Sequence, residues 1–190
     1  TAPSEWVAQA IRRHTLRPAI IIGHGVDPEE WPPGEDVGYV LWNKTRADPV
    51  CDPAVIEELA RAMPGQMFVS THGHAAANLR IVGTLPYAQG RELLRGASVY
   101  LCTTRETFGI GTREAMAAGV PVVGWAWGGQ AEFIRHMETG WLCPPGDLVG
   151  LAEGVRWARA NRQLIAARAR EDVAWRFRWE DVAGRYAQLY

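Results

Sequence analysis

The stretch ETFGIGTREAMAAGVPVVGWAWGGQAE, from Glu106 to Glu132, decides which fold the chain is expected to adopt. It combines a glycine pair, a helix-forming run, a β-branched run and a second glycine pair, with carboxylates between them. A glycine-rich turn that opens a helix is typical of α/β folds that bind a phosphate at the start of that helix. The stretch raises the question of whether it binds a redox dinucleotide or another ligand that carries a diphosphate.

Short β-branched runs alternate with segments of helical period on both sides of this stretch. The alternation is typical of βα units, so we expect an α/β fold with a Rossmann-like parallel sheet flanked by helices. The expected strands are residues 19–22, 39–42, 67–70, 79–82, 99–102, 122–125 and 141–143. The expected helices are residues 52–63, 89–95, 111–118, 130–135, 147–161 and 179–190, with a lone helix near residues 4–14.

Composition limits the classes of protein to which the chain can belong. Its 190 residues fit one domain or a domain with an appendage, and a net charge of -1 with 47% hydrophobic residues predicts a globular protein without a nucleic-acid partner. No apolar run approaches the roughly 20 residues that span a bilayer. The three cysteines, Cys51, Cys102 and Cys143, form no CxxC pair, which predicts reduced thiols in a cytoplasmic protein.

The first glycine pair does not fit the fingerprint of a redox dinucleotide site. That fingerprint requires G-x-G-x-x-G after a strand, and its third glycine allows the helix to pack closely on the sheet. Gly109 and Gly111 supply the first two positions, but Glu114 occupies the third. A second candidate, Gly23 and Gly25, fails in the same way at Pro28. A redox dinucleotide is therefore disfavoured, and the carboxylate needs another explanation.

Glu106 and Glu114 flank the expected start of a helix at the carboxyl ends of the strands, where open α/β sheets bind ligands. The backbone N–H groups of Phe108–Gly111 form an anion site between them. This layout suits a diphosphate between two polyhydroxylated rings. A structural explanation is also open, in which Thr103 and Glu106 form a capping box and Glu114 is a first-turn residue favoured by the helix dipole.

Two segments, residues 106–134 and TGWLCPPGDLVGLAEGV at residues 139–155, closely resemble the E-x7-E region of retaining GT-B glycosyltransferases of the family 4, or group 1, type. GHGVDPEEWPP, residues 23–33, is similar to the segment that enters the nucleotide-sugar domain. RWEDVAGRYAQLY, residues 178–190, looks like the closing helix. The resemblance implies one half of a GT-B fold, with a nucleoside-diphosphate sugar as donor.

The resemblance also implies a domain organisation. Residues 1–18 would be a remnant of, or lead-in from, a preceding acceptor domain, residues 19–175 the nucleotide-sugar-binding Rossmann-like domain, and residues 176–190 a closing crossover helix. Because the chain begins at Thr1 and the N-terminal acceptor domain is missing, we interpret it as a piece of a longer enzyme. We expect this piece alone to bind a donor without transferring the sugar. Peripheral membrane contact of the whole enzyme stays open.

Site roles carry over only at matching positions. The resemblance implies that Glu106 holds hydroxyls of the donor sugar and that Glu114 binds the ribose diol. Leu85 matches the loop that borders the base. A carboxylate can accept two hydrogen bonds from a vicinal diol, which makes both glutamate assignments chemically sensible. Backbone N–H groups for the sugar or phosphate are expected at Phe108, Gly109, Ile110 and Gly111.

The cations for the diphosphate are expected in the segment VLWNKTRADP. Asn43 stands where the family usually has an arginine, which leaves Lys44 and Arg46 as catalytic cations that stabilise the departing diphosphate. Lysine and arginine total 20, and Lys44 is the single lysine, which leaves 20 − 1 = 19 arginines. A lysine kept in such an arginine-rich chain favours a specific phosphate contact, although its survival by chance stays open.

Two other functions are compatible with parts of the sequence. A nucleotide-sugar epimerase would use the same fold and donor, and a non-catalytic nucleotide-binding module would fit the missing arginine. A glycosidase is disfavoured, because its two carboxylates must flank one bond rather than an anion site. His72 and His74 form an H-x-H motif, but no third ligand cluster accompanies it, so we expect neither a metal nor another cofactor.

Overall fold

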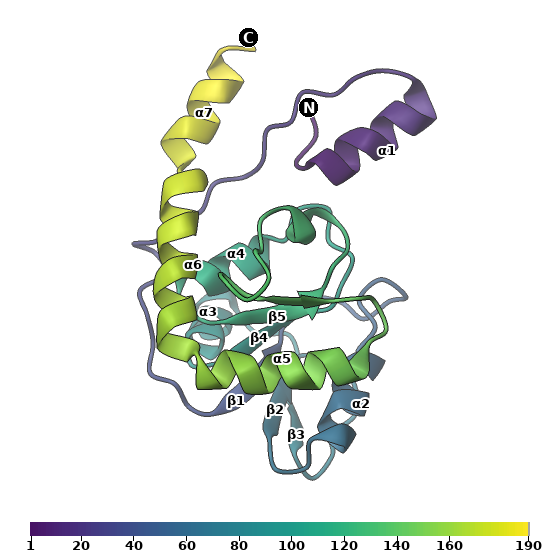
Figure 1. Ribbon diagram of the computed structural model, residues 1–190, viewed down its shortest axis with the longest axis vertical. Coiled ribbons are helices and arrows are strands. Elements are labelled where there is room, and N and C mark those ends of the chain that lie inside the picture. Colours follow the sequence, from purple (N-terminus) through teal and green to yellow (C-terminus); the bar gives the residue numbers. More distant parts are fainter. Residues whose placement is uncertain (190) are drawn as a thin grey trace.

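The computed structural model describes residues 1–189 and contains a six-stranded parallel sheet (Figure 1). The strand order is β3-β2-β1-β4-β5-β6, and every neighbouring pair runs parallel. The strands are β1 (Tyr39–Trp42), β2 (Met67–Ser70), β3 (Leu79–Ile81), β4 (Val99–Cys102), β5 (Val122–Trp125) and β6 (Trp141–Cys143). This doubly wound order confirms the predicted Rossmann-like fold class.

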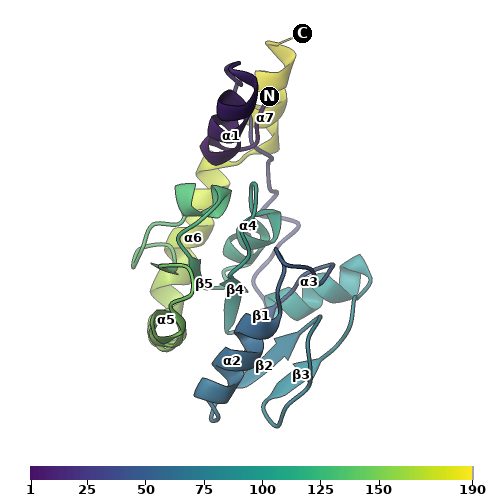
Figure 2. The same cartoon turned by 90° about the vertical axis from the view of Figure 1, so that its right-hand side faces the viewer.

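Helices cover both faces of the sheet (Figures 1 and 2). They are α1 (Glu5–Thr15), α2 (Ala54–Ala62), α3 (Tyr87–Arg95), α4 (Ile110–Ala117), α5 (Leu148–Ala160), α6 (Arg162–Arg176) and α7 (Trp179–Ala187), with a 3-10 turn η1 (Gly129–Glu132). One hydrophobic cluster joins Leu41 of β1 to residues of α3, α4 and α6. Val40 and Trp42 of the same strand join the opposite cluster with residues of α2 and α5. Alternate residues of one buried strand thus anchor the two helical layers.

Two of the expected elements were wrong. Residues 19–22 form no strand, and Ile21 makes only an isolated pairing with Ala2 outside the sheet. The apolar run there follows Pro18, and Ile20 is half exposed, so β-branched composition alone was misleading. The expected helix at residues 130–135 is the single 3-10 turn η1, which follows Gly128 with its positive φ of 66°.

The closing part of the chain contains one helix more than we expected. Helix α5 ends at Ala160, and α6 follows directly after Asn161. A break at Phe177 and Arg178 then separates α6 from α7. The final residue of the expected helix 179–190 lies outside the described residues.

The two terminal helices α1 and α7 lie at the same end of the molecule (Figures 1 and 2). The carboxylate of Glu132 in η1 accepts hydrogen bonds from the backbone N–H groups of Glu5 and Trp6, at 3.0 and 2.7 Å. Ser4 caps α1 and donates to the carbonyl of Thr107 at 2.6 Å. The N-terminus of helix α1 therefore fixes this helix to the segment of residues 107–132. No helix within residues 1–189 is both long and apolar enough to cross a membrane.

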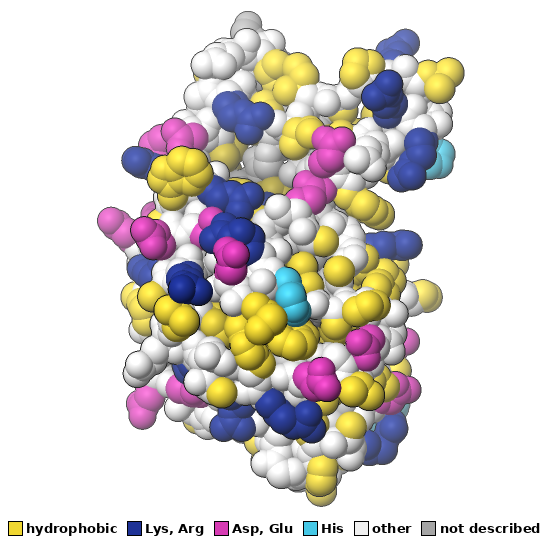
Figure 3. Space-filling view, viewed as in Figure 1, with side chains coloured by type: hydrophobic (Ala, Val, Ile, Leu, Met, Phe, Trp, Pro, Cys, Tyr) yellow, Lys and Arg dark blue, Asp and Glu magenta, His cyan; other side chains and the backbone are white. Residues whose placement is uncertain are grey.

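On the face shown in Figure 3, basic and acidic side chains are interspersed over the surface. Several arginines of the closing helices pair with carboxylates, and Asp172 of α6 contacts both Arg135 and Arg176. The arginine-rich closing helices therefore present a solvated surface of mixed charge rather than a uniformly basic one.

Candidate functional site

The candidate site lies where the strand order reverses, between β1 and β4. Loops that leave the carboxyl ends of these two neighbours turn to opposite faces of the sheet, which opens a crevice. Lys44 stands two residues after β1, and Glu106 stands four residues after β4. Residues 62 positions apart in the sequence therefore meet at the same edge of the sheet.

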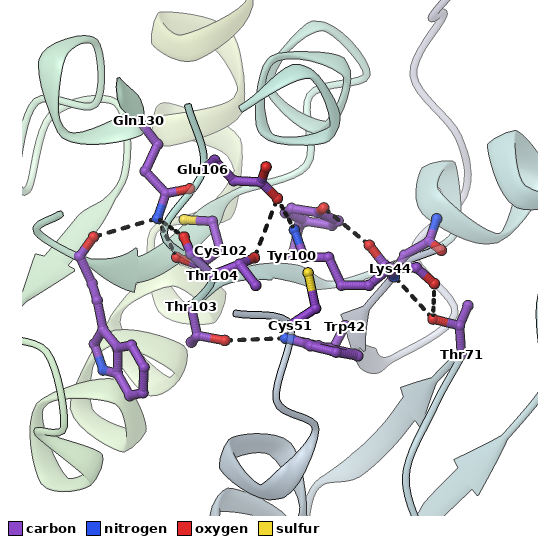
Figure 4. A network of polar contacts seen from close by, with 12 residues as sticks. Trp42, Lys44, Cys51, Thr71, Tyr100, Cys102, Thr103, Thr104, Glu106 and Gln130 are labelled. Carbon is purple, nitrogen blue, oxygen red and sulfur yellow. Dashed lines mark hydrogen bonds and ion pairs between the residues drawn. The ribbon is translucent and has the colours of Figure 1, made fainter. Parts of the chain in front are cut away.

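Lys44 and Glu106 form a direct ion pair at the centre of this site (Figure 4). The Nζ of Lys44 donates to Oε1 of Glu106 at 2.7 Å, and the Thr104 hydroxyl reaches the same oxygen at 3.3 Å. The Thr71 hydroxyl accepts from the backbone N–H of Lys44 and donates to its carbonyl, at 2.9 and 2.6 Å. The loop after β2 thus holds the backbone of Lys44 in place.

Burial and charge act in opposite directions on this pair. Burial alone would lower the pKa of Lys44, but that pKa is raised, because the Glu106 carboxylate stabilises the ammonium. The ring centre of Tyr100 lies 5.8 Å from Nζ of Lys44. Burial raises the pKa of the Tyr100 phenol, so Tyr100 stays neutral near pH 7. Burial alone would also raise the pKa of Glu106, yet Lys44 outweighs it and lowers that pKa. Both partners therefore stay charged near neutral pH.

A cavity of about 350 Å³ opens beside the ion pair. Its walls include four of the predicted site residues, Asn43, Lys44, Leu85 and Glu114. A smaller cavity of about 170 Å³ is lined by Phe108 and Ile110 of the signature loop, residues 108–111. Glu114 lines both cavities. The structure thus places six of the ten predicted site residues on the walls of these two cavities, and Glu106 beside them against Lys44.

Glu114 has an unusual electrostatic environment. Its pKa is raised to about 7, mainly by burial and to a smaller extent by the negative charge of Glu30. Glu30 lies in the segment before β1 and lines the smaller cavity together with Glu114. No ion pair to Glu114 occurs among residues 1–189. Its carboxylate therefore changes charge close to physiological pH.

The helix start between the two glutamates differs from the capping-box alternative. Helix α4 begins at Ile110, with Gly109 as N-cap at φ 86° and without a side-chain cap. Glu114 is the fifth residue of α4 rather than a first-turn residue. A Cβ on Gly111 would stand 2.8 Å from the Tyr100 hydroxyl, so this glycine permits close packing on β4. The uncapped first turn leaves its N–H groups without a side-chain acceptor, as an anion site requires.

Arg113 was not among the predicted site residues, yet it lies directly behind the signature loop. Its guanidinium is packed among Phe108, Phe133 and Phe177, with ring centres at 3.3, 3.9 and 4.1 Å. Nη1 donates to the carbonyl of Phe108 at 3.1 Å. Burial lowers the pKa of Arg113 to about 9, which reflects how far the charge is removed from water. No sequence signal marked it, because an arginine next to Glu114 looks like a solvated helix residue.

Two further residues of α3, Tyr87 and Arg91, line the larger cavity. They are four positions apart and therefore share one face of the helix. Tyr87 is 64% exposed and lines both cavities. The four-residue spacing of Tyr87 and Arg91 would have indicated this helix face if the expected helix had begun at Tyr87 instead of residue 89.

Arg46, the second predicted cation, and His74 of the H-x-H motif take no part in the ion pair. Arg46 is largely exposed and pairs with Asp48 at 2.6 Å, and it lines neither cavity. His74 contacts Glu57. Within residues 1–189 no cluster of three or more histidine, cysteine, aspartate or glutamate side chains is arranged to hold a metal ion.

The chain matches the family described as glycosyl transferases group 1 over residues 70–172, more than half of its length. The chain belongs to this family. It is 31% identical to a glycogen synthase of Mycobacterium tuberculosis over 201 aligned positions, which cover 90% of this chain and 47% of that protein. It is 39% identical to the N-acetyl-alpha-D-glucosaminyl L-malate synthase of Bacillus anthracis over 93 positions, 47% of this chain and 24% of that protein. The chain thus spans half or less of these relatives.

Solved structures with the same fold include a sucrose-phosphate synthase from Thermosynechococcus elongatus, with a TM-score of 0.85 at 21% identity. That match covers 100% of this chain and 56% of the synthase. Anabaena HepE in complex with UDP-glucose gives a TM-score of 0.86 at 18% identity, over 99% of this chain and 62% of HepE. The C-terminal domain of a group 1 family protein from Francisella tularensis matches over 81% of this chain and 99% of its own length, at 18% identity and a TM-score of 0.68. The fold is therefore that of one half of a GT-B glycosyltransferase, as predicted.

Proposed function

We propose that this chain is the donor-binding half of a retaining glycosyltransferase that transfers a sugar from a nucleoside-diphosphate sugar to an acceptor. The observation that carries the proposal is the cavity at the switch point of the sheet, which Lys44 and Glu114 line and beside which Glu106 pairs with Lys44. Lys44 and the Glu114 carboxylate line this cavity, and Phe108 and Ile110 at the start of α4 line the smaller cavity that Glu114 shares with it. The Glu106 carboxylate lies against Lys44. These groups complement a diphosphate that links a ribose to a sugar.

Each end of the donor is matched by one carboxylate in this proposal. Glu114 accepts hydrogen bonds from the ribose diol, and the loop at Leu85 borders the base. Glu106 accepts hydrogen bonds from hydroxyls of the donor sugar. The exposed face of Tyr87 offers an apolar surface to the base or ribose. Because HepE was solved with UDP-glucose, a uridine nucleotide is one candidate donor.

The diphosphate lies between the two carboxylates in the proposed complex. An ammonium has three N–H donors, so Lys44 can hold Glu106 and still donate to a phosphate oxygen. The N–H groups of Phe108, Gly109, Ile110 and Gly111 face the same anion. Negative charge builds up on the diphosphate as the glycosidic bond breaks, and these groups stabilise it. We assign Arg46 no direct contact, since Asp48 already holds it.

The rest of the proposal concerns the whole protein. We place the acceptor site in the portion of such enzymes that this chain does not cover. Sugar transfer with retained configuration and without a metal follows the family resemblance. The three cysteines are free and buried, which supports the proposed cytoplasmic location.

Calorimetry with UDP-, GDP- and ADP-glucose and with the matching diphosphates tests the donor-binding role. We expect one nucleotide series to bind the chain, and Glu114→Ala to weaken that binding. If none of the three series binds, the donor-binding role is wrong. Analysis of products after incubation with donor and candidate acceptors separates transfer from epimerisation, because an epimerase converts the donor without any acceptor.

A further inference from the structure

Gln130 is a fully buried amide at the carboxyl edge of the sheet, in the turn η1. Its Nε2 donates to the carbonyl of Cys102, the last residue of β4, at 2.7 Å and to the carbonyl of Thr104 at 3.0 Å (Figure 4). A longer contact of 3.5 Å reaches the carbonyl of Trp125, the last residue of β5. One side chain thus joins the ends of two neighbouring strands to the loop that leads to Glu106.

Gly128 and Gly129, directly before Gln130, pack closely against the same loop. The N–H of Gly129 donates to the carbonyl of Glu106 at 2.8 Å. A Cβ on Gly128 would stand 2.4 Å from the Glu106 carbonyl oxygen, and a Cβ on Gly129 would stand 2.3 Å from that of Thr107. The turn therefore approaches the loop so closely that only glycine fits, and the backbone of Glu106 cannot move toward it.

The contacts continue from this loop to the ion pair. Thr104, whose carbonyl is held by Gln130, also accepts a backbone hydrogen bond from Glu106 at 3.0 Å. Its hydroxyl donates to the Glu106 carboxylate, which binds Lys44. An apolar side chain in place of Gln130 would remove the buried hydrogen bonds of the amide and with them the tie between the strand ends and the loop. The carbonyls of Thr104 and Trp125 would keep their backbone donors, the N–H groups of Glu106 and Trp127.

We propose that Gln130 is a positioning residue that fixes the Glu106 loop, so that the Glu106 carboxylate is held against Lys44 and ready for the donor sugar. The inference rests on the proposed function for the role of Glu106. It assigns no substrate contact to Gln130. Its role is mechanical, because the amide ties the loop to two strands that cannot shift without breaking the sheet.

The chain offers a matched control in Gln66. Gln66 is also buried, and its Nε2 donates to the carbonyls of Gly38 and Met67 at 2.9 and 2.8 Å. It lies at the amino end of β2, away from the site. Gln130→Met and Gln66→Met both replace a buried amide by a side chain of similar volume, and Gln66→Met also removes the acceptor of Arg159 Nη1. The control should therefore lose at least as much stability, while only Gln130→Met affects Glu106.

The first measurement needs no nucleotide. NMR of ¹³C-carboxylate-labelled glutamate, assigned with Glu106→Gln, follows the titration of Glu106 in the free chain. The pKa of Glu106 is lowered by Lys44, and a loosened loop weakens that contact. We expect Gln130→Met to raise this pKa by roughly one unit, within the range that a neighbouring charge produces, and Gln66→Met to leave it unchanged. An unchanged pKa in Gln130→Met, or equal shifts in both variants, overturns the proposal.

The second measurement compares the nucleoside-diphosphate sugar with its diphosphate by calorimetry. Gln130→Met should lose roughly tenfold in affinity for the sugar nucleotide and little for the diphosphate, since only the sugar contacts Glu106. Equal losses for both ligands would show a general defect and contradict the positioning role. If the wild-type chain binds neither, the proposed function fails, while the titration still decides the role of Gln130. Should Gln130→Met not fold, Gln130→Asn keeps the amide but withdraws it from the strand ends by one methylene group, and it must raise the same pKa.

Discussion

The regions around Glu106 and Glu114 lie on either side of one helix start, yet they treat a carboxylate in opposite ways. Glu106 is held against Lys44, which lowers its pKa despite burial. Glu114 forms no ion pair with any of residues 1–189, and burial together with the charge of Glu30 raises its pKa to about 7. Position at the edge of the sheet therefore does not determine the charge of these groups. The neighbouring side chains determine it.

This difference separates the expected behaviour of the two ends of the donor. The Glu106 end is charged at every pH near neutrality, and its geometry depends on the loop that carries it. The Glu114 end is uncharged in part of the physiological range, and its ability to accept hydrogen bonds depends on pH. Changes at the first region should therefore act through structure, and changes at the second through protonation.

The largest expected effect comes from removing the cation of the first region. Lys44→Ala takes one contact from the diphosphate and leaves Glu106 as an unpaired carboxylate near it. We expect diphosphate binding to weaken on the order of 3 kcal/mol, roughly 100-fold, while binding of the bare nucleoside is nearly unchanged. Calorimetry with both ligands checks this. The double variant Lys44→Met with Glu106→Gln should recover part of the loss, and equal weakening of nucleoside and diphosphate would place Lys44 outside the phosphate site.

The second effect compares the two carboxylates directly. At pH 8, Glu114→Ala should weaken binding of the free diphosphate by about 2 kcal/mol, roughly 30-fold, because the ribose diol loses its acceptor. Glu106→Ala should change binding of the same ligand little, because the diphosphate carries no sugar for Glu106 to contact. The two assignments are wrong if calorimetry finds the order reversed, or negligible losses for both variants.

A third effect is the pH dependence of donor binding. The ribose diol needs the carboxylate of Glu114, and with a pKa of about 7 this group is mostly protonated at pH 6 and mostly ionised at pH 8. Affinity for the nucleoside-diphosphate sugar should therefore rise by several-fold, at most about tenfold, from pH 6 to pH 8. The sugar nucleotide is the suitable ligand because its diphosphate has no group that titrates in this range. Glu114→Gln should abolish the rise, and a rise of the same size in that variant would assign it to another group.

Much of the fold could be predicted from the sequence, because buried parallel strands appear as short apolar runs. All six strands of the sheet were expected nearly at their observed bounds. Residues 19–22 have the same composition but lie outside the sheet, and composition alone could not distinguish them. Helix α6 was missed because the expected helix ended at Asn161 and residues 162–178 were assigned no element. Only Ile165, Ala169 and Val173 of this arginine-rich segment are buried, so its apolar helical period is weak.

Several members of the candidate site could be named from the sequence, whereas Arg113, Tyr87 and Arg91 and the electrostatics of the site could not. The spacing of Glu106 and Glu114 indicated two carboxylates about one anion site, but nothing in the sequence pairs Lys44 with Glu106 across 62 positions. The charge of Glu30 on Glu114 depends on the path of the segment before β1. Arg46 has the right charge and stands near Lys44 in the sequence, but its guanidinium forms an ion pair with Asp48. Partner choice by a side chain is a tertiary property, and local pattern does not contain it.

The smallest expected effect isolates the second cause of the raised pKa of Glu114. Glu30→Gln removes the neighbouring charge but leaves burial, which is the larger cause. Burial keeps this pKa above that of a solvated glutamate, so the midpoint of the pH dependence should move downward by a fraction of a pH unit. Glu29→Gln is the matched control, because it makes the same charge change one residue away and Glu29 does not line the cavity. Titration of donor affinity should give a lower midpoint for Glu30→Gln than for Glu29→Gln. Equal midpoints would mean that burial alone sets the pKa of Glu114, and that the segment before β1 closes the cavity without tuning its charge.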